Sequence, residues 1–221
     1  MPRQDTFTLI HKGLRSFIYK MGGHMQSADF SDPLAMPPLV AEVDHGLEIL
    51  AEHGGHEEQF VFPRLVNHAP ELIATALGHH HEIHSKIESL QRSLQTTAYE
   101  RDASRWVDAG EQLNRELNDF FALYQTHLCF EENLLQPVTH QALTDEEIIG
   151  IRMAIQRSIP REKNVEFLKV VIASANNPEL VSILAGMKAG APPAAIQQTV
   201  QLYEEVLPAS RVQLVRERAG V

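Results

Sequence analysis

Only one cysteine, Cys129, occurs in the sequence, which excludes an intrachain disulfide and a metal centre held by several thiolates. The chain also lacks a run of about 20 apolar residues that could span a membrane, and its start lacks the apolar core of a signal peptide. Lysine and arginine, 19 in total, are outnumbered by 29 acidic residues and form no basic stripe. We therefore expect a cytoplasmic protein that binds neither a membrane nor a nucleic acid.

Apolar residues at helical spacing run through the whole chain, and no stretch alternates with period two for long, so we predict an all-α fold. Gly22 and Gly23 are expected to end the first helix. Residues 1–140 are predicted to form an antiparallel up-down four-helix bundle. Its helices are expected at about residues 6–21, 39–66, 70–94 and 103–136.

Residues 141–221 are predicted to form a C-terminal extension of short helices. Thr144 and Glu147 form a capping box that opens a fifth helix. Proline-containing starts predict three more helices, at Asn177-Pro178, Pro192 and Pro208. Because this part carries apolar residues but no cluster of ligand side chains, we expect it to pack on the bundle or to form a homo-oligomer with another subunit.

Histidine is abundant, with 12 residues, and none follows His140. The segments HGGHEEQFVFP (53–63) and HLCFEENLLQP (127–137) share the pattern H-x-x-x-E-E-x-x-x-x-P. Two helix hairpins related by approximate two-fold symmetry would place these segments opposite each other across a bundle.

Residues four apart on a helix lie one turn apart on the same face. Three such pairs lie on apolar stripes: His53 with Glu57, His127 with Glu131, and His80 with His84. A carboxylate buried among apolar side chains is costly unless a partner or a metal neutralises it. We therefore predict a buried metal site rather than surface histidines beside solvated glutamates. The predicted ligands are His11, His53, Glu57, His80, His84, His127 and Glu131.

Seven ligands are too many for one octahedral ion, whereas a pair of such ions offers about twelve coordination positions. Imidazole suits iron, zinc, copper or nickel, and bridging carboxylates favour a harder, octahedral ion. If both carboxylates bridge and an oxygen bridges too, about one position stays open for a small ligand. Two alternatives remain open at this level, namely Glu132 in place of Glu131 and His56 in place of His53.

The motifs, taken in order, resemble the hemerythrin-like, or HHE cation-binding, domain over roughly residues 6–140. They are His11 in HKGLR, the two H-x-x-x-E-E segments, and HHEIH at 80–84. The resemblance implies two iron ions with a bridging oxo or hydroxo group, and Glu57 and Glu131 as further bridges. It also implies that one iron is bound by His80, His84 and His127. The other, which keeps the open position, is bound by His11 and His53.

The resemblance implies dioxygen or another small diatomic or peroxide ligand as the partner. We predict a non-haem di-iron protein that binds or senses such a ligand. The alternatives are a di-iron enzyme acting on peroxide, oxygen or nitric oxide, and an iron-binding structural protein. Carboxylate-type oxidases carry two Glu-x-x-His motifs, and the chain has only the one at Glu42 and His45. A binding or sensing protein is therefore favoured over a dedicated enzyme.

Two residues near the site have open roles. Tyr124 lies one turn before His127, so it is either a hydrogen-bond donor to a bound oxygen species or a core residue whose hydroxyl is satisfied elsewhere. Cys129 lies off the ligand stripe, and we predict that it is a small buried residue. The other histidines, His79 and His81 among them, are expected at the surface or at helix ends.

Overall fold

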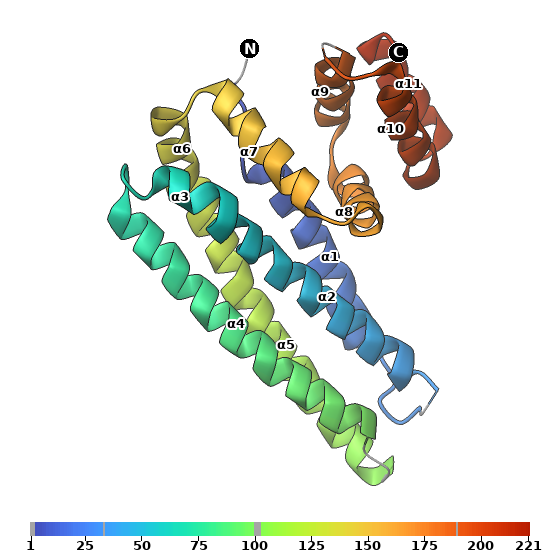
Figure 1. Ribbon diagram of the computed structural model, residues 1–221. Coiled ribbons are helices and arrows are strands. Elements are labelled where there is room, and N and C mark those ends of the chain that lie inside the picture. The colour runs from blue at the N-terminus through green and yellow to red at the C-terminus, as the bar shows by residue number, and fades with distance from the viewer. Residues whose placement is uncertain (1–2, 33, 100–102, 189) are drawn as a thin grey trace. The chain divides into compact units, whose positions relative to one another are not determined.

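The computed structural model describes residues 3–32, 34–99, 103–188 and 190–221, and every regular element in these ranges is a helix (Figure 1). The predicted all-α class is therefore confirmed. The described residues form two compact units. The first holds the chain up to Thr8 together with Phe17–Arg157, and the second holds Leu9–Ser16 together with Ser158–Val221.

The first unit is built on long helices: the C-terminal part of α1 (Thr8–Ser27), α2 (Met36–His56), α4 (Pro70–Tyr99) and α5 (Ala103–Phe130). Helix α4 packs against both α2 and α5, and Figure 1 shows the three side by side. Their facing stripes are apolar and buried, for example Leu47 on α2, Leu90 on α4 and Leu117 on α5. Burial of such stripes, more than helix propensity, stabilises helices of this kind.

Helices α1 and α2 approach closely at Gly46. A Cβ atom at this position would collide with the thioether of Met21 and would lie 2.8 Å from a ring carbon of Phe17. The absence of a side chain at Gly46 therefore allows the two helices to pack with Met21 fully buried between them.

Helix α1 runs through Gly22 and Gly23 to Ser27, so the prediction that these glycines end it is wrong. Met21 and Met25 lie one turn apart and are each 1% exposed. Burying two such side chains contributes about 1.5–3 kcal/mol each, which outweighs the cost of about 1 kcal/mol for each helical glycine.

Helix α7 (Asp145–Ser158) begins at the predicted capping box, which is confirmed. The Thr144 backbone N–H donates to the Glu147 carboxylate at 2.8 Å, and the Glu147 N–H donates to the Thr144 hydroxyl at 3.2 Å. Arg3 joins the start of this helix to the N-terminal segment through Asp145, at 2.7 Å. The units divide at Arg157, later than the boundary predicted at residue 140, and the division into domains stays a prediction.

The second unit contains α8 (Arg161–Ser174), α9 (Asn177–Lys188), α10 (Pro193–Val206) and α11 (Ala209–Ala219). The three predicted proline-associated starts are confirmed, whereas α8, which follows Pro160, was not predicted. Lys12 of α1 pairs with Glu179 at 2.7 Å, so this segment of α1 is part of the second unit. No helix in the described ranges has both the length and the apolar character that crossing a membrane requires.

Candidate metal centre

Both H-x-x-x-E-E segments leave the α-helix at their first glutamate. The π-helical turn η1 (Glu57–Val61) follows α2 directly, and η2 (Glu131–Leu135) follows α5. Each turn is closed by a bond between residues five apart: Phe62 N–H donates to the Glu57 carbonyl, and Gln136 N–H donates to the Glu131 carbonyl. The helices predicted over 39–66 and 103–136 are present, but each contains a π turn at the same point of the repeat.

The prolines of the repeat explain these turns. Pro63 and Pro137 lie near the start of the short helices α3 (Phe62–Leu65) and α6 (Gln136–Ala142). In an α-helix a proline ring clashes with the carbonyl four residues earlier and has no N–H to donate to it. In a π turn the hydrogen bond runs to the carbonyl five residues earlier, so the proline is no longer required to donate to the fourth. Such turns are frequent at functional sites. Each turn also begins with a buried glutamate, Glu57 or Glu131.

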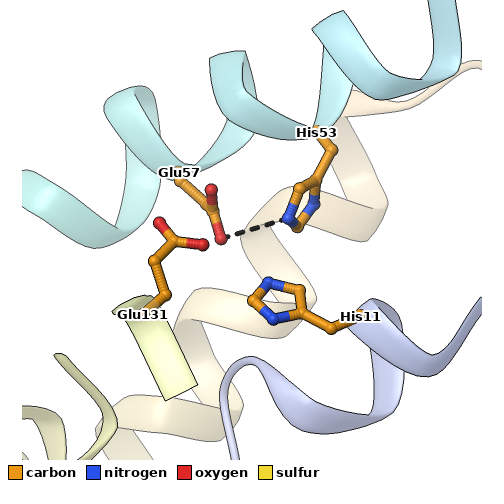
Figure 2. A group of neighbouring side chains, drawn as sticks. All are labelled: His11, His53, Glu57 and Glu131. Atoms are coloured by element: carbon orange, nitrogen blue, oxygen red, sulfur yellow. Dashed lines mark ion pairs between the residues drawn. The ribbon is translucent and has the colours of Figure 1, made fainter. Parts of the chain in front are cut away.

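The structure brings six of the seven predicted ligands into two groups. Within each group, one ligand atom from every residue lies within 4.8 Å of the others. All six side chains are buried. The first group, shown in Figure 2, comprises His11, His53, Glu57 and Glu131. The second comprises Glu57, His80, His127 and Glu131. The two glutamates therefore belong to both groups.

The distances repeat between the two halves of the site. His53 Nε2 lies 3.2 Å from Glu57 Oε1, and His127 Nε2 lies 3.4 Å from Glu131 Oε2. His80 Nε2 lies 3.1 Å from His127 Nε2 and 3.5 Å from Glu57 Oε2. Imidazole nitrogens and carboxylate oxygens thus converge on one small volume, as the ligand atoms of a metal do.

The electrostatics of the site favour a cation. Burial raises the pKa of Glu131 well above its ordinary value, and the neighbouring Glu57 carboxylate raises it further. Burial lowers the pKa of His80, but Glu57 and Glu58 together outweigh that effect, so its net pKa is raised. Two adjacent buried carboxylates are costly without compensating positive charge. A metal ion between them supplies that charge, so the donor set fits a metal.

His84 lies outside both groups and is exposed. It lines a small pocket together with His80, His127, Gly54 and Tyr124. Four residues on an α-helix turn the side chain by about 40° relative to the starting position. The buried residues Ile83, Ile87 and Leu90 lie on the other side of His80, so that rotation moves His84 away from the buried stripe.

The sequence left open whether His56 replaces His53 and whether Glu132 replaces Glu131 as a ligand, and the structure places the members of each pair differently. His53 and Glu131 belong to the groups, whereas His56 and Glu132 are half-buried and belong to neither. Burial lowers the pKa of His56, and the neighbouring His53 lowers it further.

Tyr124 donates its hydroxyl hydrogen to the Leu50 carbonyl at 3.1 Å. Of its two predicted roles, this contact agrees with that of a core residue whose hydroxyl is satisfied away from the site. Cys129 is exposed, so the prediction that it is buried is wrong. It follows His127 by two residues, or about 200° around the helix, which turns it away from the buried face.

Two residues near the site had no predicted role there. Glu58 Oε1 lies 2.9 Å from Nδ1 of His80. His79 is half-buried and meets His127 edge-on, with ring centroids 5.8 Å apart. The sequence signal for Glu58 was the second glutamate of the repeat. His79 gave no signal, because its position beside His80 predicts a different face.

Gly54 offers a test of the space beside His80. A Cβ atom on Gly54 would lie 3.4 Å from Cε1 of the His80 ring, an ordinary contact. We expect Gly54→Ala to keep the bound metal and to raise the free energy of unfolding by about 0.5–1 kcal/mol, because alanine favours the helix. Gly54→Leu would displace the ring, with an overpacking cost of about 1–3 kcal/mol and loss of bound metal in elemental analysis.

Gly55→Ala is the matched control for this pair, because a Cβ there meets nothing within 4 Å. It should give the same gain in unfolding free energy and leave the metal content unchanged. A Gly54→Leu protein that holds as much metal as the wild type would show that the His80 ring is not a ligand.

Comparison with family models matches residues 4–139, more than half of the chain, to the hemerythrin HHE cation-binding domain. Searches of the curated proteins and of the solved structures find no match to the chain. The match spans both H-x-x-x-E-E repeats and all six residues of the two groups.

Proposed function

The chain belongs to the hemerythrin HHE cation-binding family, and from this premise we propose that it holds a non-haem di-iron centre that binds or senses dioxygen or a related small ligand. The observation that carries the proposal is the sharing of Glu57 and Glu131 between two buried groups of ligand atoms. A mononuclear site needs one group, whereas a dinuclear site needs two groups joined by bridging ligands.

The fold proposed for this function is an antiparallel up-down four-helix bundle of α1, α2, α4 and α5. Its support is that each of the four helices carries a proposed ligand. A further support is that the His53 and His127 helices have the same local structure, because both lead into a π turn with the same closing bond.

We assign His80, His84 and His127 to one iron and His11 and His53 to the other, with Glu57 and Glu131 bridging. The two ions, joined also by an oxo or hydroxo group, would supply redox chemistry and one coordination position that a small ligand can take. The protein would supply the donor atoms, five of the seven from histidine side chains. Leu50 and Ile83 line the pocket beside His80, and both are buried.

The decisive test is elemental analysis of the purified protein, together with absorption spectra recorded with and without oxygen. We expect two irons per chain and a near-ultraviolet or visible charge-transfer band that changes with oxygen and reverses when oxygen is removed. One zinc ion per chain would contradict the di-iron centre. Irreversible bleaching in a single oxygen cycle would contradict reversible binding.

A pair of variants on α4 locates the metal. His80→Ala removes a ligand that is 2% exposed, and it should lower the iron content of the protein. His81→Ala removes the adjacent, exposed imidazole and should leave the iron content and the spectrum unchanged. Equal iron content in the two variants would overturn the assignment of His80.

A further inference from the structure

The His80 ring is held from several directions. Its Nε2 atom faces the site, 3.1 Å from Nε2 of His127. One face stacks on Phe62, with ring centroids 5.2 Å apart and an interplanar angle of 23°. Gly54 leaves room beside the ring. These contacts fix where the ring lies, but they do not determine which nitrogen carries the hydrogen.

The tautomer of His80 is set at its other nitrogen. Nδ1 lies 2.9 Å from Oε1 of Glu58, and a carboxylate can only accept a hydrogen bond. Nδ1 therefore carries the hydrogen in the neutral ring, and Nε2 keeps its lone pair. A histidine must present such a lone pair to bind a metal. A carboxylate at the other ring nitrogen selects the tautomer that leaves this lone pair free, and it makes the ligand nitrogen more basic.

Glu58 differs from its neighbour Glu57 in its surroundings. The side chain of Glu58 is 41% exposed, whereas that of Glu57 is 4% exposed. Water can therefore solvate the free oxygen of Glu58 while the other accepts from His80. Consecutive residues on a helix point about 100° apart. Glu57 therefore points into the centre, whereas Glu58 points toward Nδ1 of His80 on α4.

We propose that Glu58 is a positioning residue, which fixes the His80 tautomer and ring orientation so that Nε2 faces the metal. This role rests on the proposed di-iron function and deepens it, because it gives the second glutamate of the first repeat a task at the centre. Glu58 touches no metal in this assignment and acts only through His80.

The test compares Glu58→Ala with Glu58→Gln and with a charge-matched control, Glu82→Ala, on the exposed face of α4. Iron(II) is titrated anaerobically into each full-length, metal-free protein. We expect Glu58→Ala to weaken binding of one of the two ions by about 10–100-fold, the usual effect of losing such a partner. Glu58→Gln keeps an acceptor oxygen and should recover part of the affinity. Glu82→Ala should match the wild type.

The second readout is the ring nitrogen spectrum of the metal-free proteins, recorded by nuclear magnetic resonance with ¹⁵N-labelled histidine. The wild type should show His80 with hydrogen on Nδ1, and Glu58→Ala should show a mixture of tautomers. Helical circular dichroism checks that each variant is folded. A folded Glu58→Ala protein with wild-type iron affinity and an unchanged His80 tautomer would overturn the proposal. Failure of the wild type itself to bind two ions would instead overturn the proposed function, and this role with it.

Discussion

Removing the proposed metal is expected to lower the melting temperature of the protein by about 8–16 °C. A ligand that binds only the folded state, at about 1,000 times its dissociation constant, stabilises that state by about 4 kcal/mol. In a chain of about 150–250 residues, 1 kcal/mol shifts the melting temperature by about 2–4 °C. The effect is expected in the first unit, because His80, His127 and the two glutamates belong to it.

The measurement is calorimetry or circular dichroism of the iron-loaded protein, before and after anaerobic chelation. His81→Ala should show the full shift, because its imidazole is exposed and belongs to neither group. Glu131→Gln should show a smaller shift, since it loses a proposed charged ligand that is 0% exposed in the wild type. Identical melting curves for the loaded and chelated wild type would rule out a stabilising metal.

The buried face of the centre could be predicted because it depends on periodicity. His53 and Glu57, like His127 and Glu131, lie one turn apart on apolar stripes, and burial of the stripe decides which way they point. The same reasoning does not predict the exposure of His84, which lies about 40° around α4 from His80 and further from the buried stripe. Periodicity gives the face, but not the width of the buried area that the neighbouring helices cover.

The backbone of the repeat could not be predicted in the same way. The pattern contains Pro63 and Pro137, but a proline is compatible with a kink, a helix end or a π turn. Which of the three forms depends on whether the residues next to the proline are buried against the rest of the fold. Here Phe62 and Leu135 are 3% and 0% exposed. The role of Glu58 was missed for a different reason, because its partner His80 lies on another helix and is 22 residues away in the sequence.

The metal-free protein should become less stable as the pH rises. Burial and the Glu57 charge raise the pKa of Glu131 in the folded state above its ordinary value of 4.5. Between that value and the raised folded one, the folded state holds more protons than the unfolded state. The free energy of unfolding therefore falls with increasing pH, by about 1.4 kcal/mol per pH unit for one proton. The raised pKa of His80 acts in the same direction from 6.5 upward, and the lowered pKa of His56 acts against it below 6.5.

Glu131→Gln isolates the carboxyl group, because the amide fills nearly the same volume and does not titrate. Denaturant unfolding of both metal-free proteins should be measured from about pH 5 to pH 8. The free energy of unfolding of the variant should increase relative to that of the wild type as the pH rises. Parallel stability curves would mean that the folded state does not raise the pKa of Glu131. Iron should abolish the wild-type trend, because the metal takes the place of the proton between Glu57 and Glu131. Its apparent affinity should accordingly rise about tenfold per pH unit for each proton that it displaces.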